Sequence, residues 1–256
     1  MVTGVELPKV GSLVYENSHV VVVDKPAGWL SVPSRIGAKD ERFCLGRVLE
    51  QQLELRLWPV HRLDAEVSGL LMFAKSAAAH RLLGAGFEHH QIHKTYLAWS
   101  TGRLPPDAKL GVAQRWQCRL LRGKKRAYLH AAGKESVTMA TPLLCESGQT
   151  LWRLCPLTGR PHQLRVELAR RDCPIVGDSL YGSTATWGCG IALRAIELDL
   201  ADLVGRAELE LPLRLSLALP GHEQSDHKQT GRAWRRAVAS VPGHSTHTAC
   251  PAEGNS

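Results

Sequence analysis

The order of the apolar segments constrains the fold of this chain more than any other feature of its sequence. Short β-branched or aliphatic segments, typical of strands, cover 20–23, 70–74, 95–99, 137–145, 151–157 and 191–198, and a last extended segment covers 209–219. Helical spacing or a helix-start residue marks 45–53, 76–87 and 161–170. Strands and helices therefore mix without the strict alternation that a doubly wound parallel sheet requires, and we expect an α+β fold.

Composition and charge bound the class of protein. The 256 residues, 44% of them hydrophobic, are enough to bury a sizeable core as one large domain or two small ones. The sequence has neither an apolar run of about 18 residues nor a basic start followed by an apolar region, so we expect a cytoplasmic protein without a membrane segment. The net charge of +8 favours an anionic partner, but charge alone does not separate nucleic acid from a membrane surface.

The sequence offers no metal or cofactor motif. The seven cysteines are dispersed and never spaced C-x-x-C, so we expect reduced thiols and neither a disulfide framework nor a zinc site. His89 and His93 have the i,i+4 spacing of metal ligands, but no nearby glutamate or third ligand completes a site. We find no G-x-G-x-x-G, P-loop or H-E-x-x-H motif and expect no cofactor.

One carboxylate has a distinctive setting. The run 61–71, HRLDAEVSGLL, places Asp64 between a basic pair and a Ser-Gly turn, on a loop that enters the apolar segment 70–74. An arginine beside a carboxylate keeps it ionised, and an ionised carboxylate can act as a nucleophile or a base. On spacing alone, Asp64 is more simply a cap or turn residue and Arg62 a surface charge.

Five blocks, read in order, make a stronger case. They are VDKPAGW at 23–29, HRLDAEVSGLL at 61–71, KTY at 94–96, TGRPHQLR at 158–165 and VGDSLYG at 176–182. In this order they resemble the N/D-K-P-x-G, H-R-L-D-x-x-T-S-G, K-x-Y, T-G-R-x-H-Q-I/L-R and G-D-x-x-Y-G blocks of the RluA family of RNA pseudouridine synthases. The resemblance covers residues 14–219, and five ordered blocks are a specific signal where one would be weak.

The resemblance implies an architecture and an activity. The activity is the isomerisation of specific uridines to pseudouridine in structured ribosomal or transfer RNA, with no redox cofactor or energy source. The architecture is a mixed, largely antiparallel sheet with flanking helices and a central catalytic cleft, formed by residues 1–220. The first block begins close to Met1, so we expect no S4-type RNA-binding module before it. We also expect a monomer with a disordered tail over 221–256, where aliphatic residues are few.

The resemblance also assigns residues. Asp64 acts at C1′ of the sugar, either by adding to it or by removing a sugar proton to give a glycal. Arg165 pairs with Asp64, Tyr96 packs on the target base, and Arg62 fills the gap that the flipped nucleotide leaves, which lowers the few kcal/mol that flipping costs. Without the resemblance, Arg165 would be an ordinary helix-surface residue and Tyr96 a core aromatic. Further matches that we interpret as structural are Lys25, His61, Asp178 and Tyr181.

Pattern and departures add three expectations. Pro161 suits the first turn of a helix that runs to about 170, in which His162 and Arg165 would project from one face. Val67 stands where the family has Thr, and Glu167 and Arg194 stand where His is common. We expect these departures to affect substrate choice more than catalysis.

A basic window supplies the remaining candidate residues. Residues 115–136 hold seven Lys or Arg side chains against Glu135 alone. The window is either a solvated hairpin face or a ribbon that follows RNA phosphates. As RNA-binding residues the second interpretation names Arg122, Lys124, Lys125 and Arg126.

Two other functions stay open at this level. A non-catalytic RNA-binding or RNA-folding protein on the same scaffold is favoured by Val67 and the basic window, whereas retention of Asp64 beside Arg62 favours the enzyme. A Ser-His-Asp hydrolase is a distant third, because the segment 177–181, GDSLY, lacks the second glycine of a nucleophile elbow.

Overall fold

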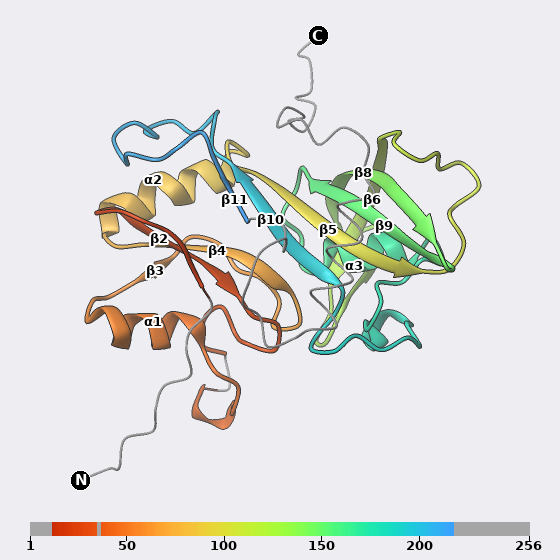
Figure 1. Cartoon of the computed structure of the whole chain (residues 1–256), viewed down its shortest axis with the longest axis horizontal. Helices are drawn as coiled ribbons and strands as arrows, with labels where there is room; N and C mark the ends of the chain where they lie inside the picture. The colour runs from red at the N-terminus through yellow and green to blue at the C-terminus, as the bar shows by residue number, and fades with distance from the viewer. Residues whose placement is uncertain (1–11, 35–36, 218–256) are drawn as a thin grey trace.

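A single mixed sheet organises the described chain, which comprises residues 12–34 and 37–217 of a computed structural model (Figure 1). Its order is β1 (Leu13–Glu16), β2 (Val20–Lys25), β4 (Ser68–Ala74), β10 (Leu193–Asp199), β5 (His93–Thr101), β9 (Gln149–Pro156), β8 (Lys134–Glu146), β6 (Gln114–Arg122) and β7 (Ala127–Leu129). Two short strands join it, β3 (Trp58–Pro59) on β4 and β11 (Arg214–Ser216) on β10. The β4–β10 pair is parallel and the other pairs are antiparallel, so the predicted α+β fold with a largely antiparallel sheet is confirmed.

Helices α1 (Leu45–Leu53) and α2 (Ala77–Glu88) cover opposite faces of β2 and β4. Successive strand residues point to opposite faces, so each strand feeds two hydrophobic cores. One core contains Val21, Val23, Leu71 and Phe73 with Leu45 and Leu49 of α1, and the other contains Val20, Val22, Leu70 and Met72 with Ala79 and Leu83 of α2. Burial on both faces explains why these two strands are continuous apolar runs in the sequence.

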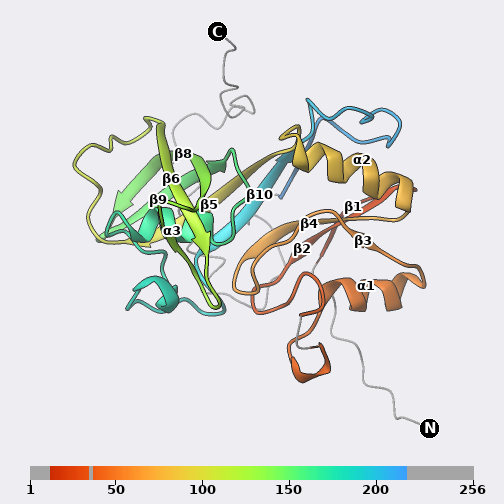
Figure 2. The same cartoon turned by 180° about the vertical axis from the view of Figure 1, so that it is seen from behind.

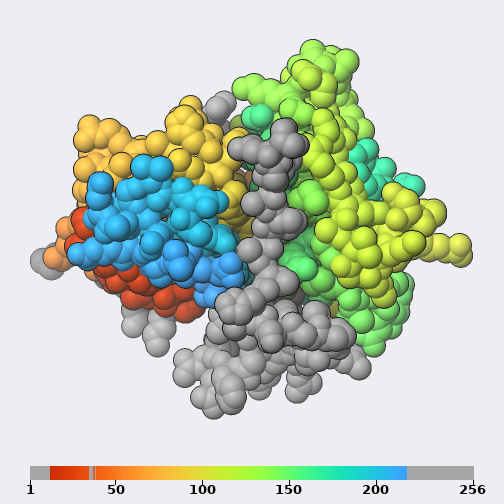
Figure 3. Space-filling model, turned by 90° about the horizontal axis from the view of Figure 1, so that it is seen from above, coloured from red at the N-terminus to blue at the C-terminus, as the bar shows by residue number. Residues whose placement is uncertain are grey.

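Helix α3 (Gln163–Ala169) packs on the other half of the sheet. Its Leu164 and Leu168 join the core that holds Trp152 and Leu154 of β9, and Figure 2 shows the helix beside these strands. Seen from above, the red, orange and blue segments lie on one side of the molecule and the green segments lie on the other (Figure 3). Two short 3-10 helices, η1 (Gly37–Lys39) and η2 (Ser179–Tyr181), complete the described elements.

The two halves of the sheet meet along a very short parallel pairing. Strand β4 pairs with β10 only through Ser68 with Arg194 and Gly69 with Ala195. Gly69 has φ +116°, and a Cβ there would lie 2.1 Å from the Ala195 carbonyl oxygen, so only glycine permits this approach. Arg194 donates to Ser68 Oγ and pairs with Asp24 of β2, which gives this departure from the family pattern a role in joining the strands.

Most of the predicted elements are confirmed. Ser76 caps α2 by accepting a hydrogen bond from the Ala79 backbone N–H at 3.1 Å, and β8 and β9 form the predicted hairpin around Ser147-Gly148. Within residues 209–217, the described part of the predicted extended segment 209–219, only Arg214–Ser216 is a strand. The predicted tail 221–256 lies outside the described residues, and the boundary of the 1–220 domain stays a prediction.

The predicted start of α3 is wrong. The helix begins at Gln163, and Pro161 lies before it, because His162 adopts a left-handed conformation with φ 52° as its N-cap. Gln163 explains the late start: its side-chain oxygen accepts hydrogen bonds from the Arg160 N–H and the Thr158 hydroxyl, which holds the preceding turn in a non-helical shape. His162 and Arg165 therefore do not share a helix face.

Among the described cysteines, Cys44, Cys118, Cys145, Cys173 and Cys189 are free thiols. Within residues 12–34 and 37–217, no helix is both long and apolar enough to cross a bilayer.

Lys25 anchors the loop that carries Asp64. Its ammonium group is fully buried and donates hydrogen bonds to three backbone carbonyls, those of Pro26 at 2.9 Å, Trp29 at 2.8 Å and Ala65 at 3.1 Å. One side chain thus joins the turn after β2 to the residue that follows Asp64.

We expect Lys25→Met to lower the free energy of unfolding by at least about 2 kcal/mol, because three partly buried hydrogen bonds to backbone carbonyl oxygens are lost. Urea denaturation followed by circular dichroism measures the change. Lys109→Met, at an exposed position, is the matched control and should stay within about 0.5 kcal/mol of wild type. Equal stability of the two variants would contradict the anchoring role.

Candidate active site

A pocket of about 150 Å³ opens where the two halves of the sheet meet. The loop before β4 contributes Arg62, Leu63, Asp64 and Val67, β5 contributes Lys94 and Tyr96, and β10 contributes Leu193. The turn before α3 and the first residues of that helix contribute residues 158–165. An apolar protein cavity of this size can hold a six-membered aromatic ring. The pocket brings together Arg62, Asp64, Tyr96 and Arg165, four residues that the resemblance singled out from three distant parts of the sequence.

Hydrogen bonds from the β2–α1 segment hold the loop around Asp64. Ser31 Oγ donates to the Leu63 carbonyl at 2.8 Å and accepts from the Leu63 N–H at 3.0 Å. The Gly28 N–H donates to the Ala65 carbonyl at 2.7 Å. The residues on both sides of Asp64 are therefore fixed, and its side chain, 32% exposed, faces the pocket.

Arg165 is the centre of the charge arrangement. Its side chain is 3% exposed and binds Asp178 through two parallel hydrogen bonds, from Nε to Oδ2 at 2.7 Å and from Nη2 to Oδ1 at 2.8 Å. The remaining nitrogen, Nη1, lies 3.4 Å from Asp64 Oδ2 and 3.4 Å from Glu66 Oε2. Burial alone would lower the pKa of Arg165, but the hydrogen bonds and charge of Asp178, with Asp64 and Glu66, raise it above its ordinary value.

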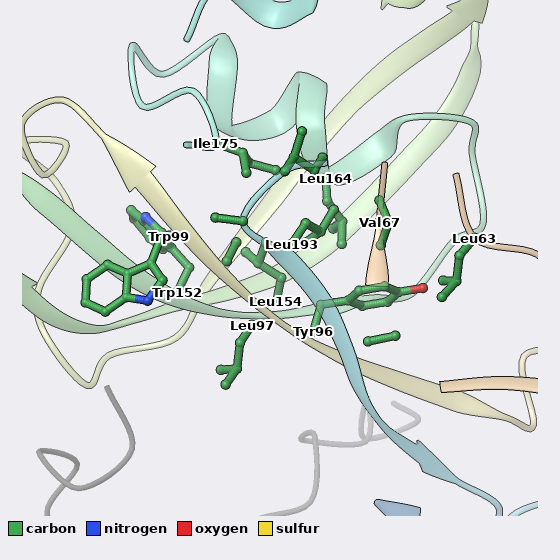
Figure 4. Packing of buried hydrophobic residues seen from close by; sticks show 14 of the residues in the cluster. Leu63, Val67, Tyr96, Leu97, Trp99, Trp152, Leu154, Leu164, Ile175 and Leu193 are labelled. Carbon is green, nitrogen blue, oxygen red and sulfur yellow. The ribbon is translucent and has the colours of Figure 1, made fainter. Parts of the chain in front are cut away.

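Tyr96 forms an apolar wall of the pocket. Figure 4 shows its ring beside Val67 and Leu63, and the three side chains are 8%, 3% and 7% exposed. Burial, together with the negative charge of Asp64, raises the pKa of Tyr96 well above its usual range, so the phenol keeps its proton. Val67, in place of the family threonine, packs its side chain into this wall and hydrogen-bonds through its N–H to the Asp64 carbonyl at 3.1 Å.

His162 is the second basic side chain beside Asp64. Its Nε2 lies 3.9 Å from Asp64 Oδ2, and its Nδ1 lies 3.0 Å from the Tyr181 hydroxyl. Burial lowers the pKa of His162, an effect that Asp64 opposes and Arg165 reinforces. We predicted only a shared helix face for His162, so its place between Asp64 and Tyr181 was missed.

Three further cations line the pocket. Arg62 is exposed at its mouth, and the Lys94 ammonium lies 5.7 Å from the centre of the Phe87 ring. Arg160 donates through Nε to the Glu135 carbonyl at 2.7 Å. Lys94 and Arg160 belong to the matched blocks, but we had not assigned either of them a role.

The four RNA-binding candidates Arg122, Lys124, Lys125 and Arg126 are exposed at the tip of the β6–β7 hairpin and do not line the pocket. The hairpin is nevertheless attached to the site. The Tyr181 hydroxyl donates to the Ala127 carbonyl at 3.0 Å and accepts from the Ala127 N–H at 2.9 Å. The same hydroxyl contacts His162, so one tyrosine joins the basic hairpin to the pocket.

The structure also places three acidic residues to which the sequence assigned either a structural role or none in catalysis. Asp178 does more than fix a turn, because it is 1% exposed and holds Arg165. Nothing in the sequence pointed to Glu66 except its position two residues after Asp64.

Glu167, a departure from the family pattern, is fully buried and pairs with Arg170 and Arg171. It does not line the pocket, so this departure lies away from the site. In the described part of the chain, no group of three or more His, Cys, Asp or Glu side chains is placed to hold a metal ion.

Known proteins are similar to this chain in sequence and in fold. The RNA pseudouridylate synthase family model matches residues 19–170. The chain is 35% identical over 197 residues to the dual-specificity RNA pseudouridine synthase RluA of Vibrio vulnificus, covering 73% of this chain and 76% of that protein. It is 32% identical over 180 residues to tRNA pseudouridine synthase C of Yersinia pestis, covering 66% of this chain and 70% of that protein.

The solved structure of human RNA pseudouridylate synthase domain containing 4 has the same fold, with a TM-score of 0.65, 20% identity, and coverage of 88% of this chain and 92% of that one. The family model and these relatives place the chain in the class of RNA pseudouridylate synthases, which are isomerases. The chain belongs to the RluA family within that class, as the five blocks indicated.

His61, in the same block as Asp64, makes the stability of the fold depend on pH. Its Nε2 accepts a hydrogen bond from the Met72 N–H at 3.1 Å, and its ring packs against Phe87. Burial, with the nearby charge of Lys94, lowers its pKa to about 3. Between pH 3 and the ordinary value of about 6.5, the unfolded chain therefore binds more protons at His61 than the folded chain does.

We accordingly expect the His61 contribution to stability to be complete above pH 6.5 and to fall by about 2 kcal/mol at pH 5. Urea unfolding at the two pH values measures the fall. The variant His61→Asn should lose this part of the pH dependence, whereas His130→Asn, at an exposed position, should keep it. An identical pH dependence in wild type and His61→Asn would assign the effect to other groups.

Proposed function

We propose that this enzyme converts specific uridines of structured RNA to pseudouridine by a base-flipping mechanism in which Asp64 is the catalytic carboxylate. The observation that carries the proposal is the placement of Asp64. Its carboxylate lies 3.4 Å from a buried guanidinium, on the edge of a pocket that can hold one ring. The carboxylate can then act at C1′, by addition or by removal of a sugar proton.

The pocket supports a role for each neighbour. The ring of Tyr96, whose hydroxyl keeps its proton, offers a flat apolar surface on which a flipped pyrimidine can stack. Arg62 is exposed at the pocket mouth, where a long cationic side chain can occupy the place of the extruded base. Arg165 lies beside the Asp64 carboxylate and orients it, while its other edge remains bound to Asp178.

The β6–β7 hairpin is proposed to bind the RNA outside the pocket. Its tip combines the exposed cations Arg122, Lys124, Lys125 and Arg126 with the exposed side chains of Tyr128, at 42%, and Leu129, at 48%. Cations beside an aromatic ring suit a phosphate backbone with unstacked bases. Relatives are named for transfer RNA or for dual specificity, and we propose a stem-loop of ribosomal or transfer RNA as the substrate. Action as a cytoplasmic monomer stays a prediction.

The direct test compares wild type with Asp64→Asn on RNA pools, with pseudouridine mapped by mass spectrometry. We expect the substitution to lower the rate by at least about 10⁴-fold, the scale on which enzymes lose activity when a catalytic carboxylate or nucleophile is removed. Asp107→Asn, on an exposed loop, should retain wild-type activity. Equal activity of Asp64→Asn and wild type would refute the role of Asp64, and an inactive wild type on every pool would favour the non-catalytic alternative.

Salt dependence tests the hairpin. We expect Lys124→Glu/Lys125→Glu to weaken RNA binding and to reduce the slope of log K against log salt by about 1 to 2, because fewer counterions are released. Arg47→Glu/Arg81→Glu, at exposed positions of α1 and α2, makes the same change in net charge and should leave the slope closer to wild type. An unchanged slope in the hairpin variant would place the hairpin away from the RNA.

A further inference from the structure

Pseudouridine formation requires a proton acceptor next to the reacting carbons. Once C5 of the turned base is bonded to C1′, C5 still carries its hydrogen and the ring has a C6=N1 double bond. Breaking the C5–H bond releases an electron pair that forms C5=C6, the C6=N1 π pair moves to N1, and N1 takes a proton from water. The step is a proton transfer without net oxidation. Because C5 is bonded to C1′, the base that takes the C5 proton must lie beside the Asp64 carboxylate, which acts at C1′.

Within the described structure, two basic side chains lie within 4.0 Å of the Asp64 carboxylate. One is Arg165, a guanidinium that cannot act as a base. The other is His162, whose Nε2 is 3.9 Å from Asp64 Oδ2. Since C5 and C1′ are bonded to each other in the intermediate, two acceptor atoms at this separation can face the two neighbouring carbons.

Hydrogen bonds define which nitrogen of His162 is free. The Tyr181 hydroxyl has one proton, which it donates to the Ala127 carbonyl at 3.0 Å, while it accepts from the Ala127 N–H. Toward His162 the hydroxyl oxygen is therefore an acceptor, and the group that faces it at 3.0 Å is Nδ1–H. In the neutral imidazole the lone pair then lies on Nε2, which faces the pocket beside Asp64.

The backbone of His162 directs its side chain toward the site. His162 is the N-cap of α3 and has φ 52°, a left-handed conformation that few residues other than glycine adopt and in which histidine is enriched. The conformation places the imidazole between Tyr181 and Asp64 rather than along the helix.

On the basis of the proposed function, we infer that His162 is the general base that removes the C5 proton of the uracil ring through Nε2. Asp64 acts at C1′, and the negative charge of its carboxylate stabilises the imidazolium that forms 3.9 Å away. Tyr181 is a positioning residue that holds the tautomer. Burial and the negative charge of Asp64 raise the pKa of Tyr96, which disfavours the phenolate that would be needed for Tyr96 to act as the base.

The test uses a short RNA that the wild-type enzyme converts, made with either hydrogen or deuterium at C5 of the target uridine. Single-turnover rates are measured for wild type, His162→Asn and Tyr181→Phe. Asparagine tolerates the left-handed backbone, so His162→Asn removes the base with little change in shape. His89→Asn, at an exposed position outside the pocket, is the matched control.

We expect His162→Asn to lower the rate by about 10²-fold or more while RNA affinity stays near wild type. The deuterated RNA should then react more slowly than the protiated RNA, with a larger isotope effect than in wild type, because proton removal limits the rate. Added imidazole should restore part of the rate. Tyr181→Phe, which keeps the ring of His162, should show a smaller loss with an increased isotope effect.

The outcomes separate this inference from the proposed function. If wild type is active and neither variant shows a larger C5 isotope effect than wild type, the inference is overturned and the proposed function stands. If wild type forms no pseudouridine on any RNA pool, the proposed function fails and the inference fails with it.

Discussion

The rest of the structure depends on the ion pairs that the buried guanidinium of Arg165 makes with the carboxylates around it. A cation that is only 3% exposed requires compensation, and three carboxylates surround it, from Asp64, Glu66 and Asp178. Asp178 is itself buried and binds two nitrogens of the guanidinium, so the pair orients Arg165 before any substrate enters. The remaining nitrogen then faces Asp64, so the orientation of the Asp64 carboxylate depends on contacts made on the far side of the arginine.

The same interaction joins parts of the chain that are far apart in sequence. Asp64 comes from the loop before β4, Arg165 from α3, and Asp178 from the segment that leads into η2. These segments lie where β4 and β10 are joined by only two residue pairs. The absence of a side chain at Gly69 allows the two strands to approach closely there. The junction holds the pocket, because side chains from both halves of the sheet converge on it. Tyr181 extends the arrangement to the basic hairpin through its hydrogen bonds with Ala127.

The sequence predicted the parts of the fold that rest on local pattern. The apolar runs of β2 and β4, the helical spacing of α1, and the Ser76 cap of α2 were all readable, because periodicity and capping depend on near neighbours. The start of α3 was not readable. Gln163 bonds back to Thr158 and Arg160 and also to Val137 of β8, and the last of these contacts spans 26 residues. The helix propensity of the residues around Pro161 does not indicate this turn, because a contact with a distant strand helps to hold it.

The sequence by itself determined the family, through five ordered blocks, and with it the identity of Asp64, Tyr96 and Arg165 as the candidate site. Tertiary structure alone decided how these residues act on one another, because contacts across about a hundred residues have no periodicity to read. It showed that Asp178 shares the charge of Arg165, that Arg194 pairs with Asp24, and that Val67 completes an apolar wall. It also placed the imidazole of His162 beside Asp64, since that position follows from a left-handed backbone and from a hydroxyl on η2 rather than from helical spacing.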